Sequence, residues 1–156
     1  MTSENLELSV TRLIDAPVNT VWKVATERLG EWWCPKPWTV EIIEQDWRAG
    51  GRSAMVMRGP KGEEMPQEGV FLEVSHGKRF VFTDAFTKDW LPQRPFMVGM
   101  MEFAAESGKT RYTGRARHWT RESYDQHKAM GFEQGWAAVA EQLAALAEAE
   151  KKASDY

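Results

Sequence analysis

The chain has 156 residues, of which 42% are hydrophobic and 28% are charged, and its formal net charge is −3. These proportions are typical of a globular protein rather than a disordered one, and the chain is long enough to bury a sizeable core. The net charge is too small and too mixed in sign to favour binding to nucleic acid or to an anionic membrane.

The cysteine count and the first residues bear on the cellular compartment. Cys34 is the only cysteine, so an intrachain disulfide is excluded and a reducing environment is expected. Residues 1–7 are polar and acidic and lack the apolar core of a signal peptide. No stretch approaches the about 18 consecutive apolar residues of a membrane-spanning helix. We therefore expect a cytoplasmic protein that does not insert into membranes.

The first part of the chain predicts one strand followed by two short helices. Residues 6–14 are expected to form the strand, because its apolar side chains alternate and share one face with Arg12. Pro17 suits the first turn of a helix over residues 18–26. A second short helix, over residues 29–33, should end before a pair of prolines that favours an extended turn.

Short runs separated by turn signals follow, and they predict an antiparallel meander. The only longer loop, residues 87–95, contains Trp90. Six strands are expected in this part of the chain, over residues 38–45, 52–58, 67–75, 79–85, 97–104 and 109–117.

The last long segment, residues 120–150, predicts one amphipathic helix with Thr120 as its N-cap. Gly131 and Gly135 are poor helix formers, and three interpretations of them remain open: close approach to a sheet, a kink near Gly131, or space for a ligand. Large apolar residues recur at spacings of four, three, four and three, which is the pattern of one buried helical face: Phe132, Trp136, Val139, Leu143 and Leu146.

Together these elements predict an α+β fold formed by a single domain over residues 1–156. The expected order is β-α-α-β-β-β-β-β-β-α, with about seven strands in one antiparallel sheet. The terminal helix is the only element long enough to cover the apolar face of that sheet.

The sequence contains no catalytic motif, so we expect no catalytic residue, no metal and no cofactor. His76, His118 and His127 are the only histidines, and they lack the spacing of a zinc site. His118 and His127 could meet where the last strand leads into the helix; packing or solvent contact is the preferred interpretation, and a metal site or acid–base pair is the alternative. Cys34 has no base near it in sequence and is interpreted as a small apolar residue.

Several motifs follow one another along the chain: Asp15-Ala16-Pro17 with Val21-Trp22, Trp32-Trp33 with Pro35, Asp46 to Gly51, Met57 to Gly62, Glu68-Gly69, Arg79 to Thr83, and Gly135-Trp136 with Leu143 and Leu146. Together they resemble the activator of heat-shock-protein-90 ATPase homologue-like family. The chain departs from the family pattern at two places, where Cys34 replaces a usual Gly and Pro37-Trp38 replaces a common Gly-Phe.

This resemblance implies a START-like, helix-grip fold, in which a curved antiparallel sheet wraps around the C-terminal helix and encloses an apolar cavity. The function that follows is binding of a small hydrophobic molecule: a lipid, a polyketide-like compound or an aromatic one. Arg12 or His118 would serve as a polar contact for that ligand. The expected binding residues are Trp32, Trp33, Met55, Met57, Phe86, Trp90, His118, His127 and Met130.

Adjacent residues on a helix point about 100° apart, so Trp32 and Trp33 cannot both face the same side. We expect one of them to pack against the sheet and the other to face the cavity.

Two other functions remain open. The first is a cyclase or hydrolase that uses the same cavity. The second is a chaperone-interacting or stress-response module that acts through its surface. The sequence leaves the oligomeric state open between monomer and homodimer.

Overall fold

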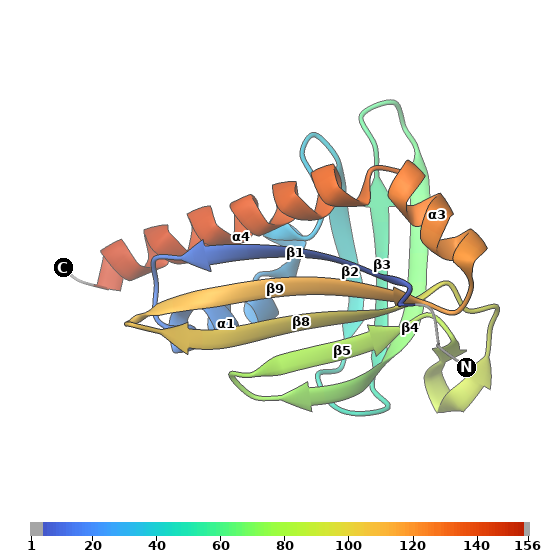
Figure 1. Ribbon diagram of the computed structural model, residues 1–156, viewed down its shortest axis with the longest axis horizontal. Coiled ribbons are helices and arrows are strands. Elements are labelled where there is room, and N and C mark those ends of the chain that lie inside the picture. The colour runs from blue at the N-terminus through green and yellow to red at the C-terminus, as the bar shows by residue number, and fades with distance from the viewer. Residues whose placement is uncertain (1–4, 155–156) are drawn as a thin grey trace.

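The computed structural model describes residues 5–154, and its main element is a seven-stranded antiparallel sheet (Figure 1). This sheet and a long C-terminal helix confirm the predicted α+β class. The sheet has the order β1-β9-β8-β5-β4-β3-β2, with strands β1 (Glu7–Ile14), β2 (Thr39–Gln45), β3 (Arg52–Arg58), β4 (Glu64–Ser75), β5 (Arg79–Thr83), β8 (Met97–Glu106) and β9 (Lys109–His118).

The predicted extent of the domain, residues 1–156, includes positions 1–4 and 155–156, which lie outside the described residues. That prediction therefore stays a prediction. Within residues 5–154, no helix combines the length and the apolar character needed to cross a bilayer.

Strand β9 shows how the sequence gives the sheet two different faces. Its buried residues are every second one, Thr110, Tyr112, Gly114, Ala116 and His118, which is the period of a half-buried strand. The residues between them include arginines that pair with glutamates of neighbouring strands, as Arg111 does with Glu106. Such exposed pairs contribute about 0–1 kcal/mol each, so the inner face is what stabilises the sheet.

Three helices pack together on the inner face. Helix α1 (Val18–Glu27) and the single turn α2 (Leu29–Trp32) connect β1 to β2, and α4 (Phe132–Ser154) contacts α1, α2 and β1. In Figure 1, α4 runs alongside β1, and the sheet bends so that β2, β3 and β4 run across the direction of the other strands. The dry core lies between these layers and includes Ile14, Val21, Trp32, Tyr112 and Leu143.

The prediction of one helix over residues 120–150 is wrong. The segment forms two helices, α3 (Arg121–Ala129) and α4, and Gly131 lies between them with a φ of 90°. Residues other than glycine rarely adopt this left-handed conformation, so the kink interpretation of Gly131 is the one that the structure supports. The N-cap prediction is confirmed, because the Thr120 hydroxyl accepts a hydrogen bond from the Ser123 amide at 3.1 Å.

The predicted loop over residues 87–95 contains a small hairpin of its own. It consists of β6 (Phe86–Thr87), one 3₁₀ turn η1 (Lys88–Trp90) and β7 (Leu91–Pro92). The exposed Trp90 ring rests on Gly50, at the turn before β3, where a Cβ atom would lie 3.1 Å from the ring. The hairpin is therefore an appendage to the outside of the sheet.

A candidate binding cavity between the sheet and the helices

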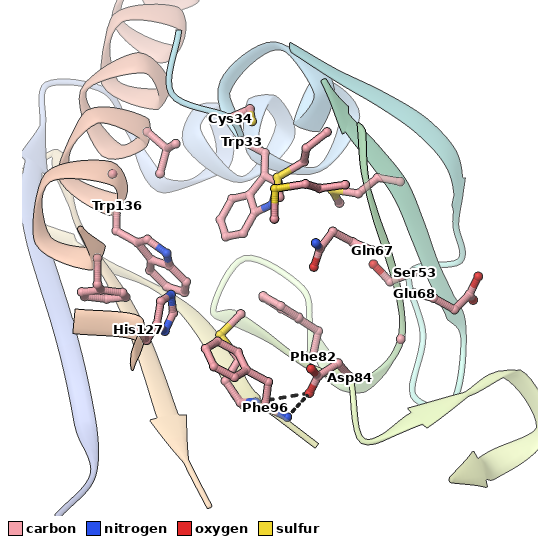
Figure 2. Close-up of a pocket in the computed structure, with 18 of the residues that line it drawn as sticks. Trp33, Cys34, Ser53, Gln67, Glu68, Phe82, Asp84, Phe96, His127 and Trp136 are labelled. Atoms are coloured by element: carbon pink, nitrogen blue, oxygen red, sulfur yellow. Dashed lines mark hydrogen bonds between the residues drawn. The ribbon is translucent and has the colours of Figure 1, made fainter. Parts of the chain in front are cut away.

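A cavity of about 980 Å³ lies where the bent sheet separates from the first turns of α4. Strands β3, β4, β5 and β8, the turn after α2 and the α3–α4 junction form its walls. Large aromatic and methionine side chains supply fourteen of the thirty-two lining residues: Trp33, Trp38, Phe71, Phe80, Phe82, Phe96, Phe132, Trp136, Met55, Met57, Met65, Met97, Met101 and Met130. Figure 2 shows Trp33, Phe82, Phe96 and Trp136 converging on one space from different elements.

Two glycines allow the aromatic rings of this wall to lie flat against the sheet. A Cβ atom at Gly99 would lie 2.3 Å from the Phe82 ring, and one at Gly114 would lie 3.1 Å from the Trp136 ring. Trp33 then packs edge to face against both rings, with centroids 6.0 Å from Phe82 and 5.5 Å from Trp136. This arrangement is the favoured one for aromatic pairs and fixes the shape of the wall.

The opposite wall carries polar groups. Ser53 and Gln67 project from β3 and β4, across the cavity from Trp136 (Figure 2). One carboxylate oxygen of Asp84 accepts hydrogen bonds from the backbone N–H groups of Phe96 and Met97, at 2.9 and 3.2 Å. These two bonds hold the start of β8 in place. Polar groups placed against aromatic and methionine side chains are the usual composition of a small-molecule site.

Glu68 also borders the cavity, but its carboxylate points away from it (Figure 2). The Arg52 guanidinium holds both of its oxygens at 2.9 Å. This carboxylate is therefore already engaged in an ion pair with Arg52.

The two histidines at the end of β9 and on α3 do meet. The Nε2 atom of His118 lies 2.8 Å from Nδ1 of His127, and both side chains are 8% exposed. The His118 Nδ1 atom lies 2.9 Å from the carbonyl oxygen of Leu6. His127 lines the cavity, and its burial and the neighbouring His118 lower its pKa to about 4. His127 is therefore neutral near pH 7.

Five of the nine predicted binding residues line the cavity: Trp33, Met55, Met57, His127 and Met130. The other four do not. Trp32 is 0% exposed in the core, where its indole N–H donates to the Ala25 carbonyl at 3.1 Å. Phe86 and Trp90 belong to the outer hairpin, and His118 lies behind His127.

Arg12, the other expected polar contact, is held elsewhere. Its guanidinium pairs with Glu141 of α4, with Nε and Oε1 2.6 Å apart. The positive charge of Arg12, on the core side of β1, is therefore paired with a carboxylate of α4, the helix that covers this strand.

Sequence reasoning missed several lining residues. Phe82 and Gln67 could have been found, because each shares a strand face with residues that enclose the cavity. Phe96 could not, because it reaches the cavity from an irregular segment whose path depends on the Asp84 hydrogen bonds. Trp136 was placed in the core and also lines the cavity.

Cys34 lies at the cavity wall and is buried, and this burial raises the pKa of its thiol. The thiol therefore stays protonated at neutral pH, which disfavours a nucleophilic role. Over the described range, residues 5–154, no three His, Cys, Asp or Glu side chains are grouped so that they could hold a metal ion.

Comparisons with known proteins support the same fold. The crystal structure of protein NE0264 from Nitrosomonas europaea is 37% identical in sequence and covers 97% of this chain and 99% of its own, with a TM-score of 0.88. Protein Ms6760 from Mycobacterium smegmatis is 27% identical over 91% of this chain and 90% of its own, with a TM-score of 0.77. An AHSA1-like protein from Aeromonas hydrophila shares the fold at 19% identity, over 92% of this chain and 93% of its own, with a TM-score of 0.69.

A comparison with curated proteins finds no match. Residues 15–148 match the family described as "Activator of Hsp90 ATPase homolog 1-like protein", and this range begins directly after β1 and includes the whole cavity wall and most of α4. The chain therefore belongs to the family of activator of Hsp90 ATPase homolog 1-like proteins, with a helix-grip fold.

Proposed function

We propose that the protein binds a small hydrophobic molecule in the cavity between the sheet and α4. The observation that carries this proposal is the size and chemistry of the cavity, about 980 Å³ lined by aromatic rings and thioethers. Ligand sites usually measure about 300–1,000 Å³ and are mostly apolar with a few polar groups. The family to which the chain belongs supports the same function, because its fold encloses such a space.

The size of the cavity indicates the class of ligand. A space at the upper end of the usual range suits a lipid, a polyketide-like compound or an aromatic compound of several rings. The aromatic walls favour flat rings, which stack or pack edge to face against indole and phenyl groups. Methionine side chains then adjust to the outline of the ligand.

Native mass spectrometry of freshly purified protein tests this function, because a bound molecule would add its mass to that of the chain. Fluorescence titration with a naphthalene sulfonate probe gives the affinity, and Trp33→Ala should weaken binding at least about tenfold. Trp119→Ala is the matched control, because Trp119 is an exposed tryptophan that does not line the cavity. Absence of a bound mass, together with equal probe affinity in both variants, would contradict the proposal.

A contact with a chaperone is the second candidate, and the name of the matched family favours it. Exposed apolar residues on the outer hairpin and beside α3, among them Leu91 and Trp119, offer contact area for it. The ATPase rate of a purified Hsp90 chaperone, measured with and without this protein, tests the idea. An unchanged rate at saturating protein would argue against it, and a role in the stress response would lose its support.

An enzymatic use of the cavity, of cyclase or hydrolase type, needs a group that exchanges protons near neutral pH. The pKa of His127 is lowered to about 4, which makes it a weak base at that pH. We therefore favour binding over catalysis.

A further inference from the structure

The hydrogen bonds of the paired histidines run in one direction, and the series begins at a backbone carbonyl in the chain's first strand region. The carbonyl oxygen of Leu6 lies 2.9 Å from His118 Nδ1. A carbonyl oxygen can only accept a hydrogen bond, so His118 Nδ1 carries the proton. In the neutral ring the other nitrogen, Nε2, is then an acceptor.

This assignment determines the state of the second ring. His118 Nε2 lies 2.8 Å from His127 Nδ1, so His127 Nδ1 must be the donor. A neutral His127 then has no proton on Nε2, and this atom is an acceptor with a free lone pair. His118 therefore acts on His127 through its tautomer, because the hydrogen bond at one ring nitrogen decides which nitrogen carries the proton.

The free nitrogen of His127 belongs to a side chain that lines the cavity. His127 is 8% exposed and is one of the lining residues. Among the described residues, no hydrogen bond to its Nε2 is formed. In the described part of the chain, Gln45 Nε2 and Tyr112 Oη are the side-chain polar atoms that are fully buried without a partner. Nε2 of His127 is not one of them, so it is not fully buried. The cavity that His127 lines is the space from which a ligand would reach this nitrogen.

The surroundings of this acceptor are apolar. The rings of Phe132, Phe96 and Trp136 lie 5.0, 5.1 and 6.0 Å from the His127 ring, measured between centroids. Among the described residues, His118 is the titratable group that affects the His127 ring electrostatically, and Tyr124 packs on the far ring, 5.9 Å from His118. A ligand that fills the cavity buries this acceptor among aromatic rings, and an acceptor buried without a donor has a high cost, so a ligand that supplies a donor gains affinity.

We propose that the ligand is an aromatic molecule with a hydroxyl group, and that this hydroxyl donates a hydrogen bond to Nε2 of His127. The inference rests on the proposed function and specifies the ligand class. His127 is then a specificity-determining residue, and His118 is a positioning residue that keeps Nε2 unprotonated. The lowered pKa of His127 agrees with this role, because a ring that stays neutral keeps its acceptor.

A matched pair of ligands tests the proposal on the unaltered protein. Calorimetric titration at pH 7 compares 2-naphthol with its methyl ether, 2-methoxynaphthalene, which has the same ring system and no donor. An apolar cavity alone would favour the ether, because of its extra methyl group. We expect naphthol to bind at least about tenfold more tightly. Equal affinities would overturn the proposal, whereas no binding of either compound would count against the proposed function instead.

Variants then assign the effect to the histidines. His127→Phe removes the acceptor and keeps a ring in place, so the preference for naphthol should fall to within about twofold. His76→Phe is the control, because His76 is an exposed histidine away from the cavity and should keep the full preference. His127→Leu serves as a second variant if the first fails to fold. A preference that survives in a folded His127 variant would contradict the proposal.

The positioning role of His118 has a spectroscopic signature. Nitrogen-15 NMR of the imidazole rings distinguishes protonated from unprotonated ring nitrogens. In the wild-type protein we expect Nδ1 of both His118 and His127 to carry the proton. In His118→Phe the His127 ring should lose this single tautomer, and the preference for naphthol should decrease. An Nε2-protonated His127 in the wild-type spectrum would overturn the assignment.

Discussion

The inner face of one sheet has two regions that differ in how completely they are filled. Where α4 contacts β1 and α1, residues such as Leu143, Tyr112 and Trp32 are fully buried and leave a dry core. Where the sheet bends past β8, residues such as Trp33 and Phe82 are only partly buried and border about 980 Å³ of space. The same kinds of apolar side chain therefore form a tightly packed core in one region and the wall of a cavity in the other.

The adjacent tryptophans after α1 mark the boundary between the two regions. Trp32 points into the dry core and donates its indole N–H to Ala25, whereas Trp33 points into the cavity. Their ring centroids are 5.6 Å apart, and the rings are nearly perpendicular. One short helix thus supplies a core residue and a lining residue in succession, as its rotation per residue requires.

Truncating each tryptophan in turn should separate the two regions most clearly. Trp32→Ala should lower the free energy of unfolding by about 3–5 kcal/mol, because it leaves a large void and an unpaired Ala25 carbonyl. Trp33→Ala should cost only about 1–2 kcal/mol, because one side of its ring already faces open space. Urea unfolding followed by circular dichroism measures both. Equal losses would show that the cavity wall is as tightly packed as the core.

The pH dependence of stability should reveal the histidine at the cavity edge. His127 has a pKa of about 4 in the folded protein and an ordinary value of 6.5 when unfolded. The unfolded chain therefore binds the proton first as the pH falls, and stability is lost between about pH 6.5 and pH 4, by up to about 3 kcal/mol. Below pH 4 this group adds no further loss.

The control for this measurement is the difference between the wild-type protein and His127→Phe. Glu7 and Glu73 have lowered pKa values because arginines hold their carboxylates, so they destabilise the fold only at lower pH, as it falls below their unfolded value of 4.5. The difference between the two stability curves should therefore show the loss of stability that His127 causes at pH values above 4.5. Parallel curves for the two proteins between pH 6.5 and pH 4.5 would show that His127 is not protected from protonation.

The smallest effect on stability is expected for Cys34, which borders the cavity and makes no side-chain hydrogen bond among the described residues. Cys34→Ala should change the free energy of unfolding by less than about 1 kcal/mol. Burial raises the pKa of the thiol, so labelling with a thiol reagent at pH 7 should be slow, and an occupied cavity should slow it further. Fast labelling that a bound probe leaves unchanged would place the thiol outside the cavity.

The strands were predictable because period-two patterns depend only on local sequence. Strand β3 has the predicted bounds, Arg52–Arg58, and the parity that directs Met55 and Met57 into the cavity follows from them. The single long helix was mispredicted because helical periodicity continues through Gly131, and only the backbone geometry shows the break.

The candidate site was harder to predict because its residues converge from separate elements. Phe86 and Trp90 are large aromatic residues of the kind that lines the cavity, but their hairpin folds onto the outside of the sheet against Gly50. The contact between His118 and His127 depends on how α3 turns back over the end of β9, which no local pattern encodes. The family resemblance therefore predicted an apolar cavity, and tertiary structure decided which residues line it.

The thioethers of the cavity wall make its chemistry sensitive to oxidation. Six of the eight methionines of the chain line the cavity, from Met130, which is 61% exposed, to Met101, which is 0% exposed. Oxidation of a methionine to its sulfoxide adds a polar oxygen and follows exposure. Peroxide would therefore convert the rim of the cavity from apolar to polar before it reaches the interior. In protein that has aged in air, the sulfoxide should therefore form at Met130 before Met101, and the rim of the cavity should become more polar than its interior.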